Sequence, residues 1–212
     1  MNELARLTPK KRKAIDPIKG TNLCMEDYWS WAHSNLLEMT TRSAFSEFLV
    51  ASALGATEHP REVWSPHDVI TPDNIRIEVK AAGHIQDYGQ KKLSLISFGI
   101  AANRSWDAVA NTLHPTGERS SDVYVFAVLS HTHKPSVDPS NTDQWTFYVL
   151  PTSALHEIPK QKTIKLSSLM RFNPIQTKYS GLKDAVLKAY EEGQQAPAPY
   201  SSPAAGSESG EA

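Results

Sequence analysis

The chain has 212 residues, of which 40% are hydrophobic and 21% charged, and this composition is typical of a soluble globular domain with its own core. No apolar run approaches the ~18 residues of a membrane span, so no membrane partner is expected. Residues 1–13 lack the apolar segment of a secretory signal. The single cysteine, Cys24, excludes an internal disulfide framework and a cysteine-based zinc cluster. We therefore expect a cytoplasmic protein, or a nuclear one if the host is eukaryotic.

The formal net charge of -1 conceals an asymmetry along the chain. Residues 1–19 carry six Lys or Arg and two acidic residues, whereas residues 189–212 carry four Glu and no Lys or Arg. The bulk charge thus gives no argument for a nucleic-acid partner, and any attraction to phosphate has to come from a local patch. We predict a basic flexible arm over residues 1–21, one folded domain over 22–192 and a disordered tail, rich in Pro, Ala, Ser and Gly, over 193–212.

Helical periodicity predicts three helices, over residues 26–37, 41–54 and 182–190. In the first, Tyr28, Trp29 and Trp31 cannot all face one core, which leaves one of them for an interface. The second begins at Thr41, the predicted N-cap, and Gly55 is typical of a C-terminal stop.

Short β-rich segments predict strands over residues 68–71, 75–82, 93–100, 122–129, 145–150 and 163–166. The segment 75–82 alternates strictly, and the turn residues Pro72-Asp73-Asn74 before it indicate a hairpin with 68–71. Phe126, Phe147 and Tyr148 lie in strongly apolar strands and are predicted to pack in the core. The expected fold class is α/β (α+β), with a mixed central sheet flanked by α-helices.

Two residues of the alternating strand, Glu78 and Lys80, share the face opposite the apolar row. Asp68 lies ten residues before Glu78, where the hairpin brings it close. Two carboxylates beside a lysine suit Mg²⁺, or Mn²⁺ in its place, and this set of groups favours phosphodiester hydrolysis. Asp73 competes with Asp68 as the first carboxylate, but its position is typical of a turn residue that bonds its own backbone.

The pattern Pro66-His67-Asp68 … Ile77-Glu78-Val79-Lys80 resembles the PD-(D/E)xK nuclease superfamily, which has the restriction-endonuclease-like fold, over roughly residues 41–150. His67 stands between the proline and the aspartate and departs from that motif. The resemblance implies a mixed four-stranded core sheet flanked by helices. It also implies that Asp68, Glu78 and the Val79 carbonyl bind metal and that Lys80 assists the attacking water.

Two further site residues follow from the same resemblance. Glu47 matches the glutamate that many members of the superfamily carry on the helix before the strands. There it would support the metal ligands from behind or bind a second metal. Its alternatives are a cap, a pair with Arg42 or a solvent-facing position. Gln86, or else Gln90, matches the glutamine that follows E-x-K in many members, where it would position water or phosphate.

Basic residues outside the proposed centre are candidates for contacts with DNA phosphates. They are Lys10, Lys11, Arg12 and Lys13 in the arm, and Lys91 and Lys92 downstream of the strand. The arm residues have the alternatives of a solvated segment or a nuclear address. His131 and His133 have metal-ligand spacing but lie in a segment typical of a surface loop. His67 and His84 flank the site, with either a phosphate contact or a structural role.

Signatures of other enzyme classes, such as G-x-S-x-G, the P-loop and G-x-G-x-x-G, do not occur in the chain. We therefore expect a Mg²⁺-dependent endonuclease that cuts DNA in restriction, repair or defence against foreign DNA. Its specificity would come from its own loops, from a homodimer or from a partner protein. The alternatives are an RNA-directed nuclease and a module of the same fold that binds nucleic acid or a partner without hydrolysis.

Overall fold

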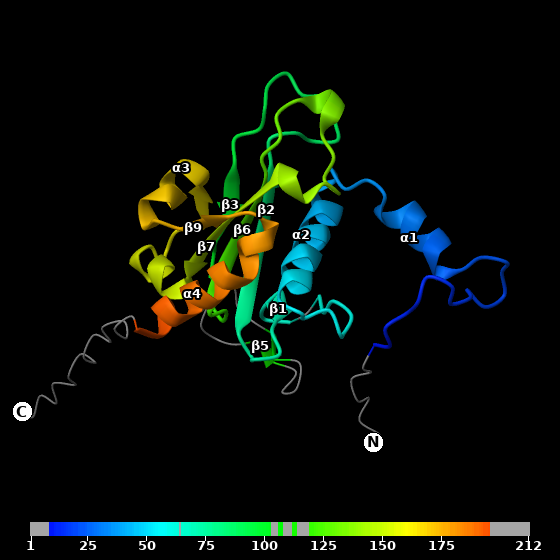
Figure 1. The fold of residues 1–212 in the computed structure, drawn as a ribbon, viewed down its shortest axis with the longest axis horizontal. Coiled ribbons are helices and arrows are strands. Elements are labelled where there is room, and N and C mark those ends of the chain that lie inside the picture. Colours follow the sequence, from blue (N-terminus) through cyan, green and yellow to red (C-terminus); the bar gives the residue numbers. More distant parts are fainter. Residues whose placement is uncertain (1–8, 64, 103–105, 108–111, 114–118, 196–212) are drawn as a thin grey trace, which may run out of the picture.

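The central element of the computed structural model is a mixed sheet of five strands (Figure 1). The structure describes residues 9–63, 65–102, 106–107, 112–113 and 119–195. The sheet order is β1-β2-β6-β7-β9, with bounds Val69–Ile70, Arg76–Gly83, Val123–Leu129, Trp145–Pro151 and Ile175–Thr177. Strands β2 and β6 are parallel, and the other neighbours are antiparallel. The expected mixed α/β class is confirmed.

Four α-helices and two small sheets complete the described fold. The helices are α1 (Met25–His33), α2 (Met39–Ala53), α3 (Leu166–Leu169) and α4 (Leu182–Gln195). Strand β3 (Ser97–Gly99) pairs with β8 (Thr163–Lys165), and β4 (Trp106–Asp107) pairs with β5 (Thr112–Leu113). Five 3-10 turns, η1 to η5, span Lys134–Ser136, Thr142–Gln144, Thr152–Glu157, Met170–Phe172 and Tyr179–Gly181. No helix within these described ranges is long and apolar enough to cross a membrane.

Strand β6 lies at the centre of the sheet, and all seven of its residues are buried. Its β-branched and aromatic side chains suit a strand that is covered on both faces. On one face, Val125 packs in a cluster with residues of α2 and α4, whereas on the other Phe126 packs with Phe98 and Leu155. The sheet therefore separates two apolar cores, and the predicted core positions of Phe126 and Phe147 are confirmed, with Tyr148 partly buried.

A tight turn joins β1 to β2 and sets their register. The Thr71 hydroxyl accepts a hydrogen bond from the Ile75 backbone N–H at 3.0 Å, and Asn74 adopts a positive φ of 61°. Val69 consequently pairs with Ile77, as the predicted hairpin requires. Because β1 has only two residues, no strand of the described chain pairs with this edge of β2 beyond Ile77.

Helix α2 begins two residues earlier than predicted. Its N-cap is Glu38, whose carboxylate accepts the Thr41 N–H at 2.7 Å, so the prediction of Thr41 as the cap was wrong. A glutamate side chain at the N-cap is long enough to reach this unpaired N–H in the first turn. The predicted stop is confirmed: Gly55 follows the C-cap with a φ of 68° and donates its N–H to the Ser52 carbonyl.

Helix α1 is shorter than predicted and ends at His33, and none of its residues is buried. It lies to one side of α2, away from the sheet (Figure 1). The exposed ring of Trp31 is therefore available for an interface. In the predicted arm, residues 1–8 lie outside the described residues, while Pro17 forms a β-bridge with Cys24.

Two strands and one helix also differ from the predicted elements, and the strand differences arise from pairing between distant segments. Only residues 97–99 of the predicted strand 93–100 are extended, and they pair with β8 instead of the main sheet. Strand β9 adds a short edge that no local pattern indicated. Helix α4 continues to Gln195, into the predicted tail, whose residues 196–212 lie outside the described residues.

The second core gives a test of the fold. Phe126 is fully buried and contacts the rings of Phe98 and Tyr124, at centroid distances of 4.9 and 5.8 Å. We expect Phe126→Ala to lower the free energy of unfolding by about 3–5 kcal/mol, because it removes apolar contacts and leaves a cavity. Urea denaturation measures this change. Val63→Ala, at an exposed position, is the control and is expected to change stability by less than about 0.5 kcal/mol.

Candidate active site

The hairpin places Asp68 against the open edge of β2. The Asp68 backbone N–H donates to the Ile77 carbonyl at 3.0 Å, and its carboxylate Oδ2 accepts the Val79 N–H at 2.8 Å. These two bonds hold the side chain alongside the E-x-K segment. Asp73 is exposed in the turn at the far end of the hairpin. The structure thus brings Asp68, and not Asp73, to the predicted site.

Glu78 and Lys80 form an ion pair on the same face of β2. The Glu78 side chain is 14% exposed and that of Lys80 is 27% exposed. Burial raises the pKa of Glu78, the negative charge of Asp68 raises it further, and Lys80 opposes both effects. The second oxygen of Glu78 has only a long contact, 3.5 Å from the Ser121 hydroxyl. Glu78 therefore lies near a second carboxylate and is incompletely neutralised by its partner.

The backbone of β2 directs the Val79 carbonyl toward Asp68. The N–H and C=O of one strand residue point to the same side, and the Val79 N–H is bonded to Asp68 on the open edge. Asp68 Oδ1, Glu78 Oε2 and the Val79 oxygen are hard donors of the kind that Mg²⁺ prefers. No three His, Cys, Asp or Glu side chains in the described part of the chain form a metal-binding group. A cation here would therefore need the carbonyl and water as additional ligands, which is common for Mg²⁺.

Glu47 projects from α2 and belongs to the same group of charges. It is buried, and both of its carboxylate oxygens accept from the Arg61 guanidinium, with Nη2 at 2.7 Å from Oε1. Burial raises the pKa of Glu47, the Arg61 bonds oppose this, and the charge of Asp68 raises it again. The partner of Glu47 is thus Arg61, not Arg42. With both oxygens held, Glu47 is placed to support the site rather than to bind an ion alone.

Three residues near the site were not predicted from the sequence. Tyr124 stands opposite Glu78 in the β2–β6 register and is buried, and burial together with the Glu78 charge raises its pKa. Arg61 and Ser121 come from loops. The parallel pairing of β2 with β6 would have identified Tyr124, but no local pattern indicates that Arg61 meets Glu47, 14 residues away.

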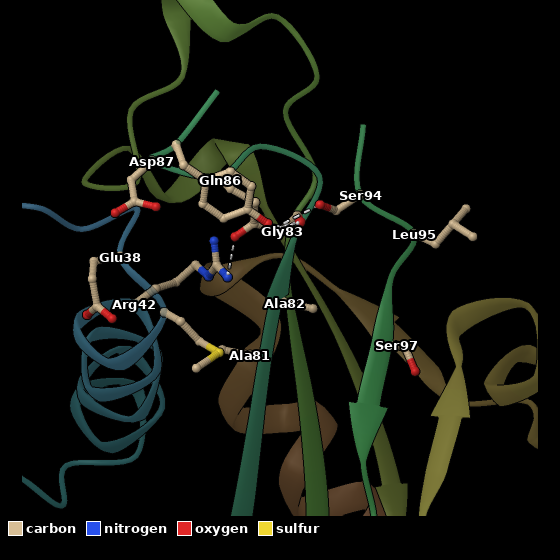
Figure 2. Close-up of a pocket in the computed structure, with 12 residues that line it drawn as sticks. Glu38, Arg42, Ala81, Ala82, Gly83, Gln86, Asp87, Ser94, Leu95 and Ser97 are labelled. Atoms are coloured by element: carbon tan, nitrogen blue, oxygen red, sulfur yellow. Dashed lines mark hydrogen bonds between the residues drawn. The ribbon is translucent and has the colours of Figure 1, made fainter. Parts of the chain in front are cut away.

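The two candidate glutamines lie at the carboxyl end of β2, where they hold a loop together. The Gln86 amide accepts from Arg42 and donates to the Gly83 carbonyl at 2.9 Å (Figure 2). Gln90 accepts the Gln86 N–H at 2.7 Å and donates to the His84 carbonyl. Within the described residues no hydrogen bond joins either glutamine to Asp68, Glu78 or Lys80. The structure therefore does not bring Gln86 into direct contact with the carboxylates.

All six predicted phosphate-contacting residues are exposed: Lys10, Lys11, Arg12, Lys13, Lys91 and Lys92. Lys11 Nζ donates to the Thr57 carbonyl at 2.5 Å, which ties the arm to the loop after α2.

The histidines have mostly structural contacts. His131 and His133 lie in the loop after β6, and both rings contact the Ser136 hydroxyl, at 2.9 and 2.8 Å. The His84 ring contacts the Ser94 carbonyl. His67 has a buried Nδ1 without a partner in the described structure, and burial lowers its pKa.

No protein-family model matches the chain, and no curated protein is significantly similar to it. What the site can do therefore follows from its own residues. Asp68, Glu78 and the Val79 carbonyl can hold a divalent cation, and the Lys80 ammonium beside them can orient a water molecule or a phosphate oxygen.

The raised pKa of Glu78 predicts that its charge costs stability. A carboxyl whose pKa is higher in the folded than in the unfolded state destabilises the fold at pH values above the folded pKa, and this cost disappears as the pH falls below the unfolded value. We expect Glu78→Gln to raise the thermal midpoint at pH 7 by about 2–4 °C, the shift that about 1 kcal/mol produces in a chain of this length. Differential scanning calorimetry at pH 7 and pH 4 measures it.

The matched control is Glu191→Gln on the exposed face of α4, which should leave the midpoint unchanged. Mg²⁺ should raise the midpoint of the unaltered protein but not that of Glu78→Gln, because only the former keeps the ligand set. A lower midpoint for Glu78→Gln at pH 7 would show that the Lys80 ion pair outweighs the cost of burial.

Proposed function

We propose that the chain is a metal-dependent nuclease with a restriction-endonuclease-like core that hydrolyses phosphodiester bonds in DNA. The observation that carries this proposal is the gathering of Asp68, Glu78 and Lys80 at the open edge of β2, with the Val79 carbonyl directed to the same side. Strands β1, β2, β6 and β7 with α2 provide the mixed sheet and flanking helix that such a core requires. The biological setting proposed is restriction, repair or defence against foreign DNA.

The roles of the residues follow from their positions. Asp68, Glu78 and Val79 would hold Mg²⁺ or Mn²⁺, which supplies Lewis-acid stabilisation of the charge that grows on the phosphate and favours ionisation of water. Lys80 Nζ hydrogen-bonds the attacking water and holds it in line with the P–O bond that breaks. The water oxygen adds to phosphorus and gives its proton to solvent, while the P–O bond to the leaving oxygen breaks and that oxygen takes a proton from solvent.

The cations around this centre supply contacts to the DNA backbone. The Arg61 side chain is 44% exposed while it holds Glu47, so its outer N–H groups can donate to a phosphate. Lys91 and Lys92 follow the same strand, and residues 10–13 add an exposed basic contact. Each phosphate contact adds salt dependence without reading sequence. Specificity is then left to loops, to a second copy of the chain or to a partner protein.

The test is cleavage of plasmid, linear duplex, single-stranded DNA and RNA with Mg²⁺, Mn²⁺ or EDTA. We expect metal-dependent cutting of duplex DNA that falls by about 100-fold or more in Lys80→Ala, because misplacing the attacking water costs about that factor. Lys183→Ala, an exposed lysine on α4, is the matched control and should cut like the unaltered protein.

Three other outcomes of the cleavage experiment would each change the proposal. Equal cutting by Lys80→Ala would place the activity elsewhere and refute the assignment of this site. Preferred cutting of RNA would change the substrate class. An unaltered protein that binds DNA but cuts none of the substrates would favour the non-catalytic module.

A further inference from the structure

A pocket of about 500 Å³ opens at the carboxyl end of β2. It lies between α2 on one side and β3 on the other, beneath the loop that carries Gln86 and Asp87 (Figure 2). Its floor is Ala81, Ala82 and Gly83. Ala82 follows Lys80 by two residues on the same face of the strand, a separation of about 6–7 Å. The pocket therefore begins about one nucleotide's length from the proposed centre of hydrolysis.

Three large apolar residues among those that line the pocket are exposed. Met39 is 69% exposed, Tyr88 is 63% exposed and Leu95 is 84% exposed, and all three line the pocket. They come from α2, from the loop after β2 and from the approach to β3. Exposed apolar side chains gathered around one opening mark a binding site. Aromatic and apolar side chains of this kind are the surfaces against which an unstacked nucleobase packs.

The polar groups of the pocket include a buried donor. Arg42 is 4% exposed, and its guanidinium makes three hydrogen bonds, all to neutral oxygens: Nη1 to the Leu37 and Ile85 carbonyls, and Nη2 to the Gln86 amide. A guanidinium has five N–H groups, so one N–H on Nη2 and that on Nε remain. Nε has no partner within the described residues. Because Nε is buried, the N–H left on Nη2 is the donor that Arg42 can offer at the pocket wall.

Asp87 supplies the complementary acceptor on the adjoining wall (Figure 2). Its Oδ2 accepts from the Asn35 amide at 3.2 Å, and Oδ1 has no hydrogen bond to a described residue. Burial lowers the pKa of Arg42 and the charge of Asp87 opposes this, but no ion pair joins the two side chains in the part of the chain that the structure describes. The pocket therefore offers a carboxylate and a guanidinium at its edge, between apolar surfaces.

We propose that this pocket binds a guanine base of the nucleic-acid strand. Guanine presents adjacent N1–H and N2–H donors to a carboxylate, and its O6 is an acceptor for the N–H left on Arg42 Nη2, so it matches Asp87 and Arg42 together. Adenine offers a carboxylate no such donor pair. The ring packs against Tyr88 and Met39, which line the same pocket. This inference deepens the proposed function, on which its biological role rests, by giving the nuclease a base preference beside the cleaved bond.

Cations beside the loop support a nucleic-acid strand at this opening. Lys134 Nζ donates to the Tyr88 carbonyl at 2.6 Å, and Lys91 and Lys92 lie in the same loop a few residues later. These cations can contact the phosphates of a strand that enters the pocket.

The experiment is calorimetric titration of the full chain, without metal, with each of dGMP, dAMP, dCMP and dTMP. We expect dGMP to bind most tightly. Asp87→Asn should weaken dGMP binding about tenfold and remove the preference, because it replaces an acceptor with a donor. Tyr88→Ala should weaken all four about tenfold through lost stacking. Arg42 is left unaltered, since its removal would unpair the buried Ile85 carbonyl and the partly buried Leu37 carbonyl.

Two matched controls lie outside the pocket. Asp143→Asn removes an exposed carboxylate, as Asp87→Asn does, and Trp31→Ala removes an exposed aromatic ring, as Tyr88→Ala does. Both control variants should bind dGMP like the unaltered chain. Absence of dGMP binding, a preference for another base, or unchanged binding by Asp87→Asn and Tyr88→Ala would each overturn the inference.

The experiments distinguish an error in the proposed guanine pocket from an error in the proposed nuclease function. Selective dGMP binding that depends on Asp87, in a protein that cuts no substrate, would keep the pocket and remove the nuclease function. DNA cutting that depends on Lys80, without selective dGMP binding, would keep the nuclease and remove the pocket.

Discussion

The two-residue length of β1 is the constraint on which the site depends. Strand β2 pairs with β6 from Ile77 to Gly83, but on its other side it pairs only at Arg76 and Ile77. Unpaired backbone groups on a strand edge need other partners. At Val79 the partner is the Asp68 carboxylate, and at Gly83 it is the Gln86 amide. The edge that no strand covers is therefore where the carboxylates, the lysine and the pocket all lie.

Charge balance explains why this edge suits a cation. The carboxylates of Glu47, Asp68 and Glu78 gather there, with Arg61 and Lys80 as their cationic partners. Both Glu47 and Glu78 have raised pKa values, first because they are buried and then because Asp68 is near. A raised carboxyl pKa predicts a cost in stability at neutral pH, and a bound divalent ion would relieve this cost. Functional sites commonly contain groups that lower the stability of the folded state.

Local patterns predicted the parts of the fold that local physics decides. Strict alternation identified β2, turn residues identified its hairpin, and the same turn chemistry distinguished Asp68 from Asp73. The sequence could not indicate that Glu47 pairs with Arg61, that β8 pairs with β3 or that β9 completes the sheet. These contacts join segments whose meeting depends on the whole fold. A motif predicts the position of a residue in the sequence but not its contacts. Gln86 follows E-x-K as the motif requires, but its amide is bonded to Arg42 and Gly83.

The most direct test of the central claim is to locate the metal. Crystals of the full chain grown with Mn²⁺, with diffraction recorded at the manganese absorption edge, give the ion's position independently of any activity. We predict an anomalous peak about 2–2.5 Å from oxygens of Asp68 and Glu78 and from the Val79 carbonyl, with Lys80 displaced from Glu78. A fully occupied manganese peak elsewhere, with the Glu78–Lys80 ion pair intact, would contradict the assignment of this edge as a metal-dependent site.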